Sequence, residues 1–244
     1  PTQNHVDEYG MQAGKTYDAE HPYDNRDYRF YANILYDGCT YRNHVMDIHY
    51  TDNKAGVDLT PYGSAYSAGV SKTGYYMGKF VDKSQTIDNN DTYGSKQNFI
   101  IWRYAEALLD YAEVCYNLGN TTLAKEYLNK TRQRVHMPDI DNVTMESIMN
   151  ERRVEMAFEE TTYWDLLRWG IAEEKMNGAS NPLKAMRIDV TTKGDVTTTK
   201  YTISNLNKSP EKVRYFTKRQ YYLPLPWSEI KYHGIAQNPD WTEQ

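Results

Sequence analysis

The feature that most constrains the fold is a helical period in the apolar residues between Phe99 and Leu118. Apolar residues recur three or four positions apart with polar residues between them, which is the pattern of an amphipathic helix. Gly119 is suited to end this helix, and Asn120 or Thr121 to cap a second one. The apolar positions of the first helix are Ile101, Tyr104, Ala105, Leu108, Ala112 and Cys115.

The second helix has an apolar side of its own and ends before Pro138, which cannot continue a helix. Its inner positions are Leu123, Ala124, Tyr127, Leu128, Thr131 and Val135. The two segments predict a helical hairpin of roughly tetratricopeptide dimensions, and such a pair needs neighbours to bury its apolar face. We expect a third helix from about Thr144 and a fourth from about Tyr163.

Other segments predict short strands joined by turns. Residues 29–38, RFYANILYDG, alternate in character and predict a strand that ends in an Asp37-Gly38 turn, with residues 41–50 as its hairpin partner. Residues 74–82 predict a further short strand, and residues 189–203 predict a hairpin with Gly194 in its turn.

These patterns together predict a mainly helical fold with loops and short β-hairpins, in which tetratricopeptide-type helical pairs pack against an irregular, loop-rich subdomain. One composite domain is expected over residues 1–244. It divides into a loop and strand-rich half at 1–97, a helical half at 98–175, and a hairpin with an extended tail at 176–244.

Charge and cysteine content exclude several classes of protein. The net charge is −5 without a basic stripe, which argues against nucleic acid as a partner. No apolar run reaches a membrane span, and no signal peptide is recognisable. The chain begins at Pro1 without an initiator Met, so we expect a mature product or a fragment. The two cysteines, Cys39 and Cys115, fit neither a disulfide framework nor a metal motif.

No metal or cofactor is expected. Residues 88–94, DNNDTYG, place oxygen ligands at alternate positions, but the glycine comes one place late for a calcium loop and no glutamate follows. His44 and His49 lie five apart, and on a strand they would point to opposite faces.

The block from Asn150 to Gly170, NERRVEMAFEETTYWDLLRWG, concentrates acids, arginines and tryptophans. Glu151, Glu155 and Glu159 repeat at intervals of four, as the paired carboxylates of a glycosidase might. The interleaved arginines would lower the carboxyl pKa values, which makes poor general acids. The acidic pattern therefore does not favour an enzyme.

The same block has a structural interpretation. Arg152 and Arg153 occupy positions of the third helix where its apolar stripe predicts core residues, and a buried arginine needs a carboxylate partner. Glu155 lies three residues from Arg152, and the tryptophans of the next helix can stack on guanidinium planes. We expect an ion-pair and aromatic clamp between the third and fourth helices, made of Glu151, Arg152, Arg153, Glu155, Trp164, Asp165, Arg168 and Trp169.

Tyrosine is the outlier of the composition, with 23 Tyr against 5 Phe. A tyrosine has an apolar ring face and a polar hydroxyl, so tyrosines in loops are suited to stacking on sugar rings. The alternative interpretation is that these tyrosines cover the helical layer. The candidate ligand-binding residues are Tyr17, Tyr23, Tyr41, Arg42, Asn43, Tyr62 and Tyr66.

Six stretches, in order, resemble the SusD/RagB family of nutrient-binding outer-membrane lipoproteins, and specifically its C-terminal domain. They are PTQNHVDEYGM, NRDYRFYANILYDG, GYYMGKFVD, IIWRYAEALLDYAEVCYNLGN, NERRVEMAFEETTYWDLLRWG, and YYLPLPWSEI with QNPDW. The chain departs from the family pattern at Tyr28, Glu160, Thr162 and Asp240, and the loss of an arginine at 162 removes one expected ion pair.

The resemblance implies a SusD-like fold and a non-catalytic protein at the surface of Bacteroidetes-type bacteria. It implies capture of oligosaccharide or polysaccharide and delivery to a SusC-like TonB-dependent transporter. It also implies a lipid anchor in an N-terminal half that this chain lacks. Two alternatives stay open, a peptide-binding RagB-like nutrient receptor and a tetratricopeptide-type scaffold whose partner is only protein.

Overall fold

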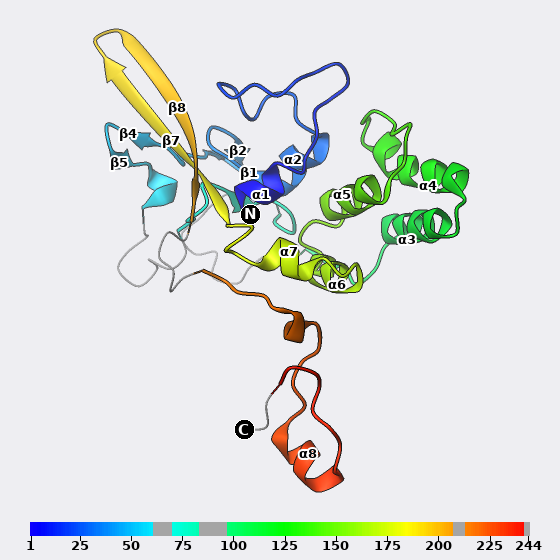
Figure 1. Ribbon diagram of the computed structural model, residues 1–244. Helices are drawn as coiled ribbons and strands as arrows, with labels where there is room; N and C mark the ends of the chain where they lie inside the picture. Colours follow the sequence, from blue (N-terminus) through cyan, green and yellow to red (C-terminus); the bar gives the residue numbers. More distant parts are fainter. Residues whose placement is uncertain (61–69, 83–96, 207–212, 242–244) are drawn as a thin grey trace. The chain divides into compact units, whose positions relative to one another are not determined.

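The computed structural model describes residues 1–60, 70–82, 97–206 and 213–241 (Figure 1). The chain folds as two compact units. The first unit consists of Pro1–Glu159 and Lys184–Leu206, and the second consists of Glu160–Leu183 and Asn207–Gln244. The subdivision at residues 97 and 175 rests on composition alone and stays a prediction.

The predicted helical hairpin is present in the first unit, as α3 (Tyr104–Asn117) and α4 (Thr121–Arg134). Gly119 ends the first of these helices with a left-handed φ of +80°, a conformation that glycine adopts at little cost. The Asn120 side chain accepts a hydrogen bond from the Leu123 amide at 3.1 Å and caps α4.

Helix α3 begins five residues later than the apolar period suggests. Arg103 precedes it in an extended conformation, and its guanidinium binds carboxylates that follow α5 (Met145–Glu155). Ile101 and Trp102 are exposed, so no burial favours a helical conformation there. The third predicted helix is α5, and Thr144 caps it as expected, with Ser147 completing a capping box.

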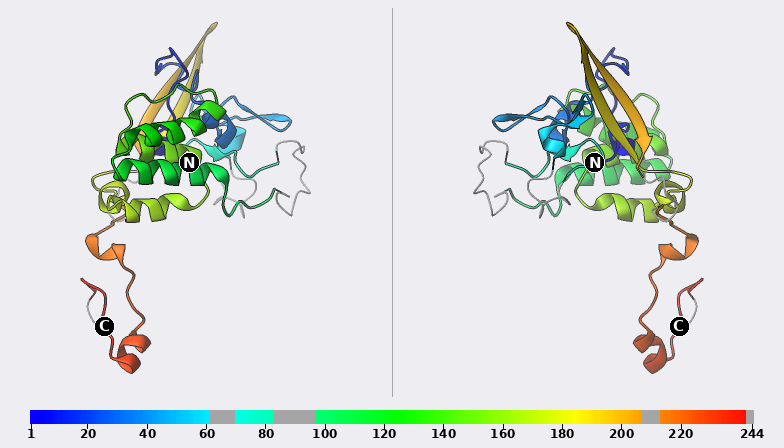
Figure 2. Two further views of the ribbon diagram at one scale, coloured as in Figure 1. Left: turned by 90° about the vertical axis from the view of Figure 1, so that its right-hand side faces the viewer. Right: turned by 90° about the vertical axis from the view of Figure 1, so that its left-hand side faces the viewer.

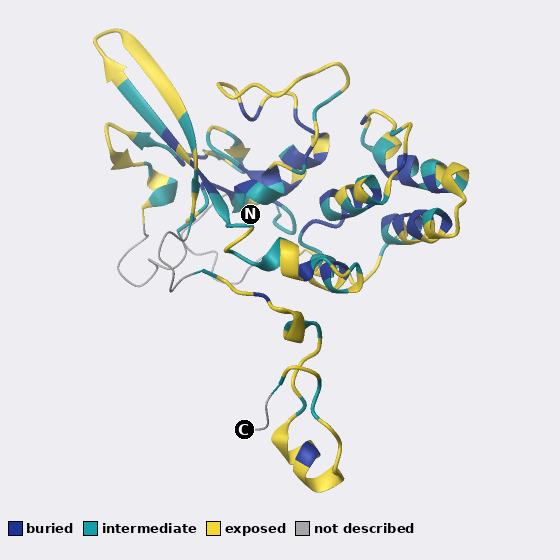
Figure 3. Cartoon of the chain, viewed as in Figure 1, coloured by how far each residue is buried: buried dark blue, intermediate teal, exposed yellow. Residues whose placement is uncertain are grey.

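One core cluster joins these three helices. Its buried members come from α3, α4, α5 and the residues that flank α5, and Figure 3 colours the buried positions of these helices dark blue. They are Leu109, Ala112, Cys115, Ala124, Leu128, Val143, Ile148 and Met156.

The alternating pattern predicts a strand over residues 29–38, but residues 29–33 are helical and only Ile34–Leu35 form a strand. Helix α2 spans Tyr28–Asn33, and the Asp27 side chain caps it by accepting from the Arg29 amide at 2.9 Å. Phe30 is fully buried. The helical turn directs the Arg29 guanidinium to partners more than a hundred residues away, which period-2 alternation cannot reveal.

Pairing of the short strands also differs from the predicted hairpin. Strand β1 (Ile34–Leu35) pairs with β6 (Tyr76–Met77), and the predicted partner at 41–50 forms other contacts. Within it, β2 (Thr40–Tyr41) and β3 (His44–Val45) form a small hairpin of their own.

A four-stranded sheet with the order β5-β4-β7-β8 completes the first unit. The predicted C-terminal hairpin is present as β7 (Lys184–Lys193) and β8 (Val196–Asn205), and Gly194 in its turn has φ +60°. Its far end is exposed (Figure 3) and projects beyond the rest of its unit (Figure 2). Strand β4 (Tyr50–Thr51) pairs with β7 in parallel and with β5 (Lys54–Ala55) in antiparallel orientation.

A second core cluster lies between α1 (Gln3–Val6), α2 and the sheet. It is unusually aromatic. Its buried members are Val6, Tyr9, Tyr23, Phe30, Ile34, Tyr75, Val154, Met186 and Ile188. A short 3-10 helix at Val57–Leu59 follows β5.

The second unit contains α6 (Thr161–Arg168), α7 (Ala172–Met176), a 3-10 helix (Lys218–Tyr221) and α8 (Trp227–His233). Its small core centres on Leu166, Ala172 and Phe216. In the proline-broken tail, the Gln237 amide accepts from the Leu225 backbone at 2.8 Å and donates to it at 3.1 Å. The QNPDW ending is therefore a strap bonded to the preceding extended segment.

No helix among the described residues combines the length and apolar character that crossing a membrane requires. The calcium-like stretch at 88–94 lies outside the described residues.

Candidate functional site

Three buried carboxylates follow one another along α5 and the turn after it. The side chains of Glu151, Glu155 and Glu159 are 1%, 1% and 3% exposed. A carboxylate buried to this extent requires charged donors, because the loss of hydration costs several kcal/mol per ion. The structure supplies those donors from four separate segments.

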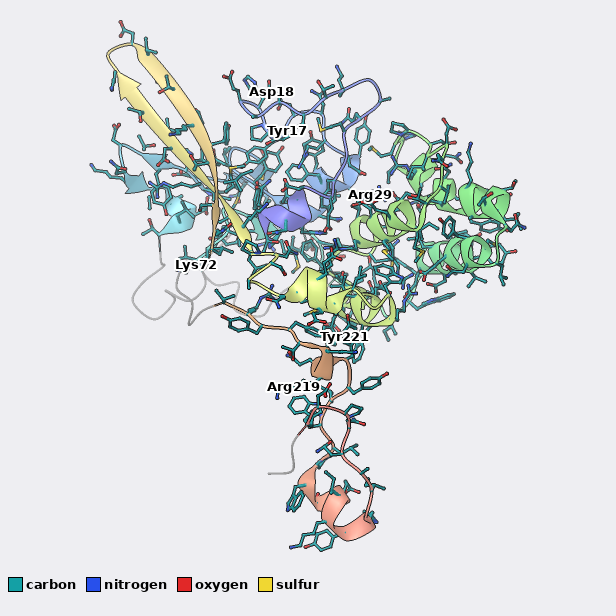
Figure 4. All side chains as sticks on the ribbon, viewed as in Figure 1. Tyr17, Asp18, Arg29, Lys72, Arg219 and Tyr221 are labelled. Atoms are coloured by element: carbon teal, nitrogen blue, oxygen red, sulfur yellow. The ribbon has the colours of Figure 1, made fainter. Side chains whose placement is uncertain are left out.

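Glu151 is bound by donors from α2 and α4. The Arg29 guanidinium donates to both of its oxygens, Arg132 Nη1 donates to Oε2 at 2.8 Å, and the Thr131 hydroxyl donates to Oε1 at 2.9 Å. Arg29 also donates to Asp27 Oδ2 at 2.7 Å, so one guanidinium joins α2 to α5. Figure 4 shows Arg29 between these two helices.

Glu155 is bound by three arginines. Arg103 Nη1 donates at 2.7 Å, Arg134 Nη2 at 2.8 Å and Arg29 Nη1 at 3.0 Å. Glu159 accepts from Arg103 Nε at 2.7 Å and from the Lys79 ammonium. Arg103 thus connects two of the three carboxylates, and the whole forms one continuous buried ion-pair network.

The network favours the ionised form of two of its carboxylates, Glu155 and Glu159. Burial alone would raise the pKa of Glu155, but the hydrogen bond from Arg103 and the charges of Arg29 and Arg134 outweigh it, so the pKa lies below its ordinary value. Burial is likewise outweighed at Glu159, where hydrogen bonds from Arg103 and Lys79 lower the pKa. A carboxylate that is ionised and saturated with donors is a poor proton donor to a substrate.

The two arginines that the sequence places on the apolar stripe of α5 also have carboxylate partners. Arg152 is 5% exposed and reaches α3, where it binds Asp110 Oδ1 and, at 3.2 Å, Glu106 Oε1. Arg153 binds Glu8 in the segment after α1. The carboxylate partners of these two arginines come from α3 and from the segment after α1.

The remaining clamp residues lie in the second unit. Arg168 Nε donates to Asp165 Oδ1 at 2.9 Å, and its guanidinium lies 4.9 Å from the centroid of the Trp169 ring. Trp164 is exposed and meets the edge of Tyr163 at 5.1 Å between centroids. Each unit therefore has its own arginine cluster, and a single clamp that joins α5 to α6 stays a prediction.

A cavity of about 450 Å³ opens above the network; we call it the α2 cavity. Its floor includes Arg29 and Glu155, and its open rim carries the half-exposed Tyr28 ring and His136, whose ring meets Tyr28 edge-on at 6.5 Å. The other lining residues are Ala32, Asn33, Lys79, Ile100, Arg103, Arg134 and Val135. Aromatic and aliphatic walls with guanidinium and imidazole groups are the lining that binds small polar molecules.

Two of the predicted ligand-binding segments present their side chains at the surface. Tyr17 is half exposed, with the Arg26 guanidinium 5.5 Å from its ring centroid. Tyr41 ends β2, and the Arg42 guanidinium lies 5.2 Å from its ring. Asn43 is exposed in the same turn. Tyr62 and Tyr66 lie outside the described residues.

Tyr23 is not a surface residue, contrary to its place among the candidates. It is buried in the aromatic core, with its ring centroid 4.7 Å from Tyr36 and 5.8 Å from Tyr201. Burial raises its pKa far above the ordinary value. Tyr23 therefore stabilises the first unit and offers no ring face to a ligand.

Sequence reasoning missed the partners of the α5 carboxylates. Arg29 and Glu151 are separated by 122 residues, and Lys79 and Glu159 by 80. No local spacing can indicate such pairs. The sequence held one indication that further cations must approach α5. Three carboxylates on a mostly buried helix need more cationic partners than Arg152 and Arg153 can provide.

Several known proteins resemble this chain in sequence or fold. The SusD-like protein of Bacteroides ovatus is 26% identical over 177 residues, which is 62% of this chain and 32% of that protein. SusD-like protein P38 of Formosa agariphila is 31% identical over 146 residues, 54% of this chain and 27% of the relative. A solved SusD-like protein of Bacteroides fragilis matches 99% of this chain and 47% of its own, with a TM-score of 0.72 and 27% identity.

A second solved structure from Bacteroides fragilis, described as a SusD-like carbohydrate-binding protein, matches 76% of this chain and 37% of its own, with a TM-score of 0.60 and 26% identity. The fold is thus that of the SusD-like proteins. The model of the SusD family matches residues 1–241, and the chain belongs to that family. It spans less than half the length of each of these four proteins.

Proposed function

We propose that this chain is part of a cell-surface protein that binds oligosaccharides and breaks no bond in them. One observation carries the proposal: the SusD-family model covers nearly the whole chain, and a solved relative with this fold is described as a carbohydrate-binding protein. The geometry of the first unit is consistent with binding rather than catalysis, because Glu155 and Glu159 are engaged by cations and are poor proton donors.

The α2 cavity is the proposed contact with sugar in the first unit. The exposed face of Tyr28 suits stacking on a pyranose ring, and the His136 imidazole and the outer donors of Arg134 suit hydrogen bonds with hydroxyl groups. Arg29, Arg103 and Glu155 of the cavity lining belong to the ion-pair network, so this part of the cavity is fixed before a ligand arrives. Such preorganisation lowers the entropic cost of binding.

The absence of catalysis is also part of the proposal. Glycoside hydrolysis needs one carboxyl group that can donate a proton. Glu155 and Glu159 have lowered pKa values and accept from arginine or lysine at every oxygen. Neither is suited to that task.

Delivery of the ligand is proposed from the family relationship. Proteins of the family are associated in general with the cell surface and outer membrane. We therefore place the full-length protein there, held by an N-terminal lipid anchor, with a SusC-like TonB-dependent transporter as its protein partner.

A second function, binding of a protein partner, is favoured by one observation. Helix α3 and the residues before it expose several large apolar side chains, and such exposure marks a protein contact in many structures. They are Ile101, Trp102, Tyr104, Tyr111, Val114 and Leu118.

Calorimetric titration with a panel of neutral and charged oligosaccharides tests the proposal. We expect at least one glycan to bind, and Tyr28→Ala to weaken that binding by about tenfold, as loss of a central aromatic contact does. Tyr232→Ala removes a more exposed tyrosine, on α8, and serves as the control. Absence of binding to every glycan, or turnover of any of them, would contradict the proposal.

A further inference from the structure

A second cavity, of about 410 Å³, lies within the second unit; we call it the tail pocket. Its walls come from the start of α6, the segment 214–216, the 3-10 helix and the C-terminal strap. The residues that matter for its chemistry are Tyr163, Arg214, Tyr215, Phe216, Gln220 and Trp241. Four of these six are aromatic, so ring faces dominate the wall.

The pocket is built on fixed backbone. The Gly178 amide donates to the Arg214 carbonyl at 2.7 Å, and a Cβ on Gly178 would lie 3.0 Å from that oxygen. The Asn177 side chain donates to the Phe216 carbonyl at 3.3 Å. Residues 214–216 are therefore bonded to the turn after α7, and a side chain at position 178 would push them away.

The indole of Trp241 is fixed as well. Its Nε1 donates to the Tyr222 carbonyl at 2.9 Å and to the Arg219 carbonyl at 3.2 Å. The Arg219 guanidinium lies 4.6 Å from the ring centroid. Tyr221 meets Phe216 edge-on at 5.4 Å and supports the opposite wall; Figure 4 labels both Arg219 and Tyr221.

The charge of the tail pocket differs from that of the α2 cavity. Among the residues that the structure describes, its lining includes the exposed Arg214 and no carboxylate. Residues 213–221 also carry Lys218 and Arg219 and no acid. Among the residues that the structure describes, none of these three cations makes an ion pair, whereas every arginine in the α2 cavity binds Glu155.

We propose that the tail pocket binds one sugar ring that carries a negative charge, such as a hexuronate, with the carboxylate on Arg214. The aromatic walls take the apolar faces of the ring, and the planar guanidinium can bind the carboxylate through two parallel hydrogen bonds. This inference rests on the proposed function and names the class of glycan.

The test is a titration of the 244-residue chain with trigalacturonate and with its methyl ester, which keeps the rings and removes the charge. We expect the ester to bind about tenfold more weakly, and Arg214→Gln to weaken binding of the acid about tenfold while it leaves the ester unchanged. Lys231→Gln removes one cation from α8 of the same unit and should have little effect. A sulfated trisaccharide shows whether the anion must be a carboxylate.

The outcomes separate this inference from the proposed function. Binding of neutral glycans that depends on Tyr28 but is unchanged in Arg214→Gln overturns the tail pocket and leaves the function standing. Equal loss in Arg214→Gln and Lys231→Gln also overturns it, because the effect is then one of net charge. Failure of every glycan to bind overturns the function itself.

Discussion

Arginines occupy two contrasting settings in this chain. Around α5, Arg29 and Arg103 are drawn into a network in which every carboxylate is buried and bound. In the second unit, the described lining of the tail pocket contains Arg214 and no carboxylate. The arginines around α5 thus stabilise the fold, whereas we propose that Arg214 serves in recognition, and the difference lies in the acids around each arginine.

The largest expected effect is on stability at Arg29. Substitution Arg29→Met keeps much of the side-chain volume but leaves Asp27, Glu151 and Glu155 without their shared cation. Loss of one partner from a buried ion pair costs about 3–5 kcal/mol in the free energy of unfolding. Urea denaturation of the variant measures this cost.

Arg214→Gln is the matched control for Arg29→Met, because a substitution of an exposed side chain without bonded partners changes stability by no more than about 0.5 kcal/mol. Equal stability losses at Arg29 and Arg214 would remove the distinction between the two settings.

The second largest effect is expected from acid, which should lower the stability that the ion-pair network contributes. The folded pKa values of Glu155 and Glu159 lie below the ordinary value of 4.5, so the folded state binds fewer protons than the unfolded state. Their contribution to stability is complete above the unfolded pKa and is lost as the pH falls through the folded one. We expect the free energy of unfolding to decline below about pH 4.5.

Denaturation curves at several pH values, recorded for the natural chain and for Arg103→Gln, isolate this effect. The variant lacks the arginine that binds both carboxylates, so its acid dependence should be flatter. A variant with an unchanged acid dependence would show that other groups control acid unfolding.

A smaller effect is expected at Arg152. It is as buried as Arg29, but its partner Asp110 is half exposed and regains hydration when the cation is removed. Arg152→Ala should therefore lower stability by about 1–3 kcal/mol, and affect glycan binding only through unfolding. Calorimetric binding measured well below the melting temperature distinguishes these effects, and a stable variant that has lost binding would contradict a structural role.

The sequence predicted the elements whose signals are local. The α3–α4 hairpin, its Gly119 and Asn120 caps, and the β7–β8 hairpin with Gly194 all follow from periods and turn residues within one segment. The family motifs were also readable, because they are contiguous.

What the sequence could not provide was long-range pairing. The residues of helix α2 were predicted to form a strand because the segment alternates in character. In the structure they form a helical turn, from which the Arg29 guanidinium reaches Glu151. Tyr23 was assigned to the surface because it lies in a polar loop, yet Tyr36 and Tyr201 surround its ring. Of the candidate site, the charged block around α5 is contiguous in the sequence, whereas the α2 cavity and the tail pocket are lined by segments far apart in the chain.

The parallel pairing of β4 with β7 has a topological consequence. The chain leaves the first unit after Glu159, returns at Lys184 to add β7 and β8 to the sheet, and leaves again after Leu206. The second unit is thus tied to the first by three covalent crossings rather than one. The covalent route from strands β5 and β4 to strands β7 and β8 of the same sheet therefore passes through residues 160–183 of the second unit.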